Sequence, residues 1–209
     1  MSAGIQGIQG MHGSEAVALA ARQQARAGRN GVYGMVLLVG AEVVFFLGLV
    51  WVTLWVRRSA PVWPPVDAPA LDWPLLMANT AALLASGGTM LAAQRAIQRG
   101  RRRPMAGWTA VTLVLAGLFM AGQWREFVHI GGWQADGTVG ATFLTLFNVL
   151  TGFHAAHVAA GALLLCLVLF RAARGHFDAH NHVFVTAAAL FWYLVAAVWL
   201  VLLAALVVV

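Results

Sequence analysis

A long uncharged stretch with two histidines near its centre constrains this chain more than any other feature. Residues 142–170 contain no Asp, Glu, Lys or Arg. About 20 apolar residues suffice to cross a hydrocarbon core roughly 30 Å thick. His154 and His157 are three residues apart, which places both imidazoles on one face of an α-helix. The stretch therefore predicts a membrane-spanning helix that carries a polar patch inside the bilayer.

The composition places the rest of the chain in the membrane as well. Hydrophobic residues make up 61% of the sequence, charged residues 10%, and the mean hydropathy is +0.80, which excludes an ordinary soluble domain. The sequence predicts an all-α integral membrane bundle of five transmembrane helices. Their apolar runs lie near residues 35–56, 75–97, 108–127, 143–170 and 183–209. We expect residues 35–209 to form the membrane domain and residues 1–34 to form a separate N-terminal segment.

The basic residues predict how the helices are oriented. All thirteen are arginine, and ten of them fall in the N-terminal segment and in the second and fourth loops, against three on the opposite side. The positive-inside rule then puts the N-terminus in the cytoplasm and the C-terminus on the periplasmic or extracellular side. Such arginines also suit anionic lipid head groups, so the basic charge calls for no nucleic acid. The first residues lack the apolar core of a secretory signal. A surface amphipathic helix near residues 15–26, with Val17 and Leu19 against lipid or a partner, and a disordered tail both remain open.

Glu42 is the most costly residue of the first apolar run, because a charge at that depth costs about 2.5–3.5 kcal/mol. Either the carboxyl is hydrogen-bonded within the bundle, or it handles protons or contacts a lipid or another subunit. At about 1.5 Å per residue, Glu42 lies roughly 12 Å and His157 roughly 20 Å from the inner boundary. We expect Glu42 to meet the face of His154 and His157 and to form a lipid-binding or proton-handling cluster.

Other polar residues are predicted to be structural. The segment NTAALLASGGTM, residues 79–90, repeats small and hydroxyl side chains at helical spacing, so Asn79 is expected on a helix-packing face. Arg125 and Glu126 lie near the outer end of the third run, where interfacial ion pairs are expected rather than a catalytic site.

No redox centre or catalytic residue is expected in this chain. The other four predicted helices contain no histidine to complete a haem or copper site with His154 or His157. Cys166 is the single cysteine, which excludes an intrachain disulfide and a cysteine-based metal site. In the segment HFDAHNH the spacing of His176, Asp178, His180 and His182 is compatible with zinc or nickel, but a solvated loop is the favoured interpretation.

An ordered series of segments resembles subunit III of haem-copper respiratory oxidases. The segments are GAEVVFFLG, NTAALLASG, GQWREF, DGTVGATFL and TGFHAAHV, and the last helix continues the series with Asn181, His182, Trp192 and Trp199. Glu42 matches the family's intramembrane glutamate, and Glu126 matches its second acid. The resemblance runs from about residue 34 to the C-terminus.

The resemblance implies a non-catalytic subunit of a cytochrome c or quinol oxidase in a bacterial or archaeal cell membrane. Its partners would be subunits I and II, which hold the haem and copper, and membrane lipids, with bound phospholipid expected in this chain. Such a subunit stabilises subunit I and supports proton uptake during aerobic electron transport. The alternatives are a subunit III-like accessory subunit of a nitric oxide reductase and a stand-alone small transporter.

The chain also departs from the family pattern. Thr186, Tyr193 and Ala196 stand where the family usually has a Glu, a His and an Asp in the last helix. Full-length members have two further N-terminal helices, so the resemblance implies a five-helix form.

Overall fold

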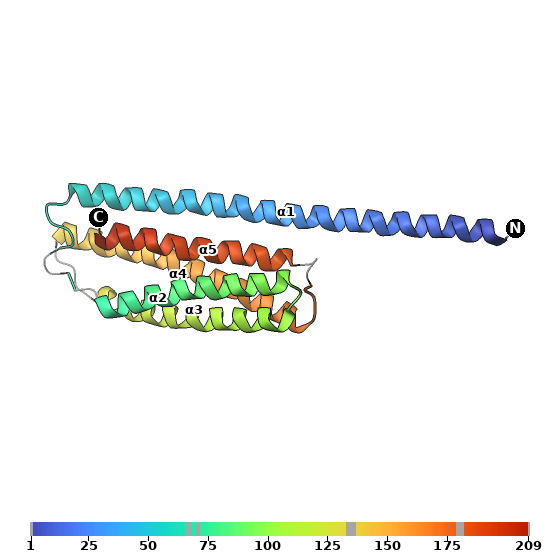
Figure 1. Ribbon diagram of the computed structural model, residues 1–209. Helices are drawn as coiled ribbons and strands as arrows, with labels where there is room; N and C mark the ends of the chain where they lie inside the picture. Colours follow the sequence, from blue (N-terminus) through green and yellow to red (C-terminus); the bar gives the residue numbers. More distant parts are fainter. Residues whose placement is uncertain (1, 66–67, 70–71, 133–136, 179–181, 209) are drawn as a thin grey trace.

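The computed structural model describes residues 2–65, 68–69, 72–132, 137–178 and 182–208 (Figure 1). Within these ranges it is all-helical and contains five segments long and apolar enough to cross a membrane. The predicted five-helix membrane bundle is thereby confirmed. Its helices are α1 (Ser2–Ser59), α2 (Trp73–Gln98), α3 (Arg102–Gly131), α4 (Gly137–Ala173) and α5 (Val183–Leu203), and a π-helical turn, η1 (Ala204–Val208), follows α5.

The helices extend beyond the apolar runs that predicted them, because arginine continues a helix easily while its charged end reaches the interface. α3 begins at Arg102 and α4 runs past Arg171 to Ala173. In α1 the membrane-crossing part is Asn30–Ser59, and the backbone before it is helical from Ser2. Residues 15–26 therefore belong to the same helix as the first span, and Figure 1 shows this part of α1 extending alone beyond the bundle.

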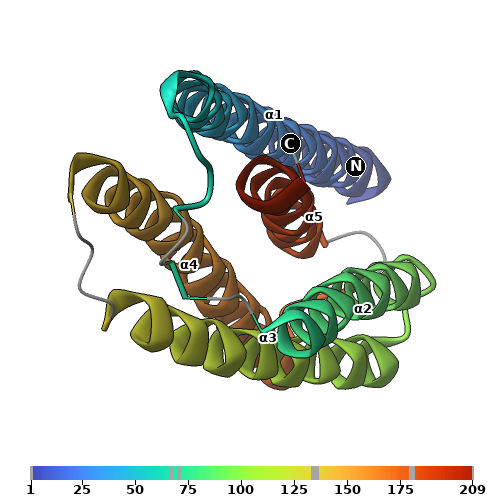
Figure 2. The same cartoon turned by 90° about the vertical axis from the view of Figure 1, so that its left-hand side faces the viewer.

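α5 is the central helix of the bundle. Figure 2 shows it enclosed by α1, α2 and α4, with α3 lying against α2 and α4. In an apolar stretch of 18 residues within each span, 56% of α5 is buried inside the chain, against 11% of α1. This difference follows from the sequence, because α5 carries apolar or aromatic residues around its whole circumference and has no charged residue. α1 is peripheral and packs mainly on α5.

The predicted packing face of α2 is confirmed by its contacts with α5. The indole N–H of Trp192 donates to the Ser86 hydroxyl at 3.0 Å, and the indole N–H of Trp199 donates to Thr80, also at 3.0 Å. The seven-residue spacing of the two tryptophans puts both on one side of α5, two helical turns apart. Small hydroxyl residues on α2 thus leave room for large aromatic donors on α5.

Tyr193, one of the residues that depart from the family pattern, links α5 to α2. Its hydroxyl donates to the side-chain oxygen of Gln94 on α2 at 3.1 Å. The tyrosine at this position therefore adds a third hydrogen bond between α2 and α5.

Candidate functional site

Glu42 of α1 and His157 of α4 meet inside the bundle. Glu42 Oε2 lies 2.8 Å from His157 Nε2, and the side chains are 25% and 18% exposed. The two residues are far apart in sequence, on helices that otherwise make few contacts. A carboxyl and an imidazole would each cost free energy if exposed to lipid without a partner, and here each is the hydrogen-bond partner of the other.

The other ring nitrogen of His157 fixes how this pair holds its proton. Nδ1 lies 2.7 Å from the backbone oxygen of Phe153, an acceptor, so Nδ1 carries a hydrogen and donates it. Between Nε2 and Glu42 there is then one proton, which sits either on the carboxyl or on the imidazole. In both arrangements the pair as a whole has no net charge, and with the proton on the carboxyl it also avoids the desolvation cost of two separate charges.

Aromatic rings surround the pair. Phe45 and Phe46 of α1 lie 6.4 and 4.9 Å from the His157 ring, and Phe191 of α5 stacks on it at 6.3 Å, measured between ring centroids. These rings limit the approach of water to one side of the pair. Two of these rings have a signal in the sequence, because the FF doublet three residues after Glu42 places aromatic rings on the turn that follows the carboxyl.

His154 takes no part in this hydrogen bond. Its side chain is 1% exposed, and neither ring nitrogen has a partner among the residues that the structure describes. It lies against Trp199 of α5 at 5.3 Å, Phe119 of α3 at 6.0 Å and Phe46 at 6.4 Å between ring centroids. The two histidines therefore lie in different environments.

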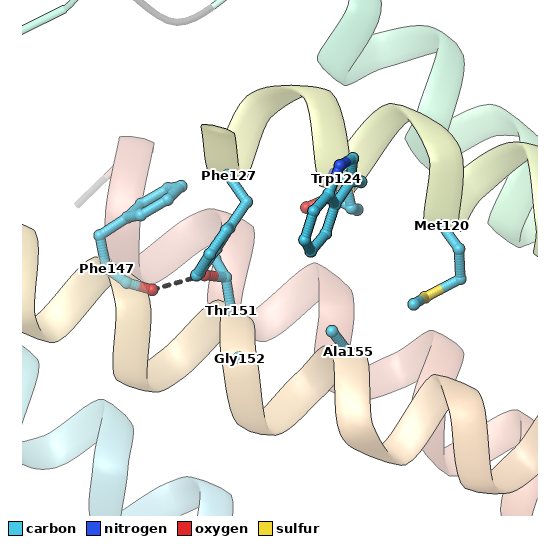
Figure 3. A pocket seen from close by; sticks show the side chains of 8 residues that line it. Met120, Trp124, Phe127, Phe147, Thr151, Gly152 and Ala155 are labelled. Carbon is cyan, nitrogen blue, oxygen red and sulfur yellow. Dashed lines mark hydrogen bonds between the residues drawn. The ribbon is translucent and has the colours of Figure 1, made fainter. Parts of the chain in front are cut away.

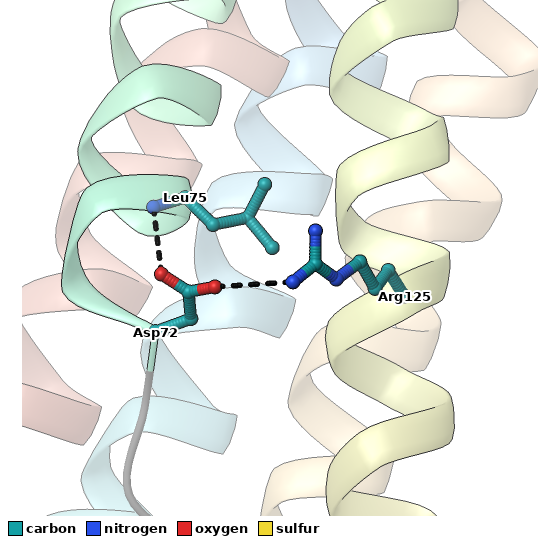
Figure 4. A network of polar contacts seen from close by, with 3 residues as sticks. All are labelled: Asp72, Leu75 and Arg125. Carbon is teal, nitrogen blue, oxygen red and sulfur yellow. Dashed lines mark hydrogen bonds and ion pairs between the residues drawn. The ribbon is translucent and has the colours of Figure 1, made fainter.

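The three residues predicted to be structural lie at the contact between α2 and α3. Asn79 is buried and fits against Gly122, where a side chain on the glycine would collide with it. Arg125 reaches α2 and pairs with Asp72 at 3.3 Å (Figure 4). The same carboxylate caps α2 by accepting the backbone N–H of Leu75 at 3.1 Å.

Arg125 and Glu126 were expected to form ion pairs near the interface. For Glu126 this expectation is wrong. Glu126 turns inward and is 6% exposed, while Arg125 turns outward to Asp72. Consecutive residues of an α-helix project about 100° apart, so neighbours in the sequence do not face one another. Asp72 was missed, although an Asp directly before Trp-Pro is typical of a helix start.

Comparison with known proteins identifies the family. The family model for cytochrome c oxidase subunit III matches residues 14–208. The chain belongs to the cytochrome c oxidase subunit III family.

Curated relatives in the subunit III family agree. "Cytochrome c oxidase subunit 3" of Synechocystis sp. is 37% identical over 172 residues, which cover 82% of this chain and 72% of that protein. The proteins of the same name from Carassius auratus and Cyprinus carpio are each 38% identical over 177 residues, covering 81% of this chain and 66% of theirs. This chain thus spans about two thirds of the length of the fish relatives.

The surface of this subunit III family member has a groove between α3 and α4 (Figure 3). Its volume is about 200 Å³, and Met120, Trp124 and Phe127 line it from α3. Gly152 and Ala155 of α4 form its opposite wall. Nearly all of its lining is apolar, so the groove suits a hydrocarbon chain and no charged ligand.

The histidine-rich loop lies partly outside the described residues. His176 and His182 are described, whereas His180 is not. Within the described ranges, no group of three or more His, Cys, Asp or Glu side chains is placed to hold a metal ion.

Proposed function

We propose that this chain acts as the non-catalytic subunit III of a respiratory haem-copper oxidase. The match of the subunit III family model to residues 14–208 carries this proposal. In this role the chain stabilises subunit I, holds phospholipid beside it and supports proton uptake during turnover. Haem and copper then belong to the partner subunits I and II, and the complex lies in the cell membrane of a bacterium, in keeping with the relative from Synechocystis sp..

Glu42 and His157 are the residues that we assign to lipid binding or proton handling. Two observations support the assignment: Glu42 Oε2 lies within hydrogen-bond distance of His157 Nε2, at 2.8 Å, and both side chains retain partial exposure of 25% and 18%. A lipid head group or a water molecule can therefore reach the pair while aromatic rings shield its other sides. His154 is buried away from this opening, so it contributes through packing and not as part of the pair.

Lipid retention has a second support in the groove between α3 and α4. Its volume of about 200 Å³ and its apolar lining suit part of an acyl chain. Exposed Trp124 at 68% supplies an amphipathic ring of the kind that anchors helices at the membrane interface.

The decisive experiment is purification of the affinity-tagged chain in mild detergent, followed by visible spectroscopy and mass identification of its partners. We expect oxidase subunits I and II to co-purify with their haem spectrum. Co-purification with a nitric oxide reductase supports that alternative instead. Recovery of a chain without partners that transports a solute in liposomes contradicts both complexes.

The orientation of the chain is a separate prediction. Ten arginines against three predict a cytoplasmic N-terminus, and five spans then place the C-terminus on the opposite side. An alkaline phosphatase fused after Val209 should therefore be active, and a fluorescent protein that matures only in the cytoplasm should be dark there. The opposite result for both fusions contradicts the orientation.

A further inference from the structure

The Glu126 carboxyl has an oxygen that the described residues leave without a hydrogen bond. The side chain is 6% exposed, and its Oε1 is covered and has no partner. Leaving a buried polar atom unpaired costs about 1–3 kcal/mol. Buried polar atoms in folded proteins are satisfied by protein groups or by ordered water.

A small cavity adjoins this carboxyl. Glu126 and Gln123 of α3 and Thr151 of α4 line it, and apolar side chains of α2, α4, α5 and η1 form the rest of its wall. The space open to the centre of a water-sized sphere is about 20 Å³. One water molecule needs about 10–15 Å³ by this measure, so the cavity has room for one water and is too small for a lipid chain.

The polar groups on its wall complement one another. The Thr151 hydroxyl donates its hydrogen to the backbone oxygen of Phe147 at 2.6 Å, as Figure 3 shows. The hydroxyl oxygen then remains available as an acceptor, as does Glu126 Oε1, while the Gln123 amide can donate. Two acceptors and one donor match a water molecule, which typically makes about three hydrogen bonds when buried.

We propose that one ordered water molecule occupies this cavity and bridges Glu126 on α3 to Thr151 on α4. The water completes the hydrogen bonding of a carboxyl whose neighbour Arg125 is engaged with Asp72. It also adds a polar link between the last turns of α3 and the middle of α4. This site is separate from the Glu42–His157 pair.

X-ray radiolytic footprinting of the full-length chain, purified with its partners, tests the site, because hydroxyl radicals form at bound water and oxidise the side chains beside it. Trp199 lines the cavity, whereas Trp192 on the same helix does not, and both are nearly fully buried at 3% and 0% exposure. We expect Trp199 to be oxidised several-fold faster than Trp192. Equal rates for the two tryptophans overturn the proposal.

Variants at Glu126 show whether the oxidation of Trp199 comes from a water held by this carboxyl or from solvent that enters the bundle generally. Glu126→Leu removes the acceptor and should lower oxidation of Trp199 to the rate of Trp192, whereas Glu126→Gln keeps an acceptor and should preserve it. Faster oxidation of Trp199 that persists in Glu126→Leu shows that the water is not held by this carboxyl. If Glu126→Leu does not assemble, Thr151→Val replaces it, with the same expected loss and the same contradicting result.

Discussion

Replacing Glu42 by leucine is expected to leave the haem spectrum and the initial rate of the partner oxidase nearly normal, while subunit retention and activity over many turnovers decline. The loss of the carboxyl leaves Nε2 of His157, now 2.8 Å from Glu42, without its partner. An unpaired polar atom of this kind costs about 1–3 kcal/mol, at the lower end here because the pair is partly exposed. Retention is measured by quantifying this chain against subunit I after detergent washing, and endurance by following oxygen consumption to exhaustion.

A double-mutant cycle isolates the pair from the effects of each residue alone. His157→Leu is expected to destabilise the chain more than Glu42→Leu, because it leaves the Glu42 carboxyl in the membrane without a hydrogen-bond partner. The double variant should be destabilised by less than the sum of the two single variants. The difference should be about 0.6 to 1.7 kcal/mol, the range for hydrogen bonds between membrane helices. Val44→Leu, 71% exposed on the same helix, is the matched control and should have no effect. If the effects of the two substitutions on stability are strictly additive, Glu42 and His157 do not interact and the proposed pair is wrong.

Glu42→Gln distinguishes hydrogen bonding from proton handling. A glutamine amide can donate to Nε2 of the neutral imidazole but cannot exchange a proton with it. If the pair handles protons, retention should stay near the wild-type level while endurance falls as in Glu42→Leu. Wild-type endurance in Glu42→Gln contradicts proton handling and leaves lipid or structural support as the role of the pair.

The membrane fold and the meeting of Glu42 with His157 were both predictable, because the membrane restricts the alternatives. Each apolar run had to span the bilayer, and each ionisable residue in a run needed a partner. The longer helices narrow the expected difference in depth from about 8 to about 6 Å, and the two side chains bridge the remainder with their 2.8 Å hydrogen bond. From Asn30 and from Ala173, the ends of the spans in α1 and α4, Glu42 and His157 lie at depths of about 18 and 24 Å at 1.5 Å per residue.

The different environments of His154 and His157 were not predictable, because they depend on how α4 is rotated about its axis. Residues three apart on a helix point about 60° away from each other. That angle suffices to turn His157 towards Glu42 while His154 faces Phe119 and Trp199. The partner of Arg125 depends likewise on the rotation of α3 against α2, which no local sequence pattern reports.

Gly152 and Gly161 are small residues in the sequence of α4 that predict close approach of a neighbouring helix, but the sequence does not tell which of the two makes such a contact or with which residue. A Cβ at Gly161 would lie 2.9 Å from Cε3 and 3.1 Å from Cζ3 of Trp192. The indole cannot easily move away, because it is fully buried and its N–H is bonded to Ser86. His157 lies one turn before Gly161, so displacement of α4 here also strains the pair with Glu42.

Gly161→Ala and Gly152→Ala should therefore have opposite effects on stability, although both change a glycine of α4 to the same residue. At Gly152 no neighbouring atom lies within 4 Å of the new Cβ, so alanine is expected to stabilise the helix by about 0.5–1 kcal/mol. At Gly161 overpacking against Trp192 is expected to cost about 1–3 kcal/mol. Denaturant titration of the detergent-solubilised chain measures both changes.

A second substitution, Trp192→Leu, serves as the control. Added to Gly161→Ala, it should reduce the destabilisation by the alanine, because the indole ring that the new Cβ would contact is then absent. A Gly161→Ala variant as stable as Gly152→Ala would show that α4 and α5 lie further apart than the structure has them.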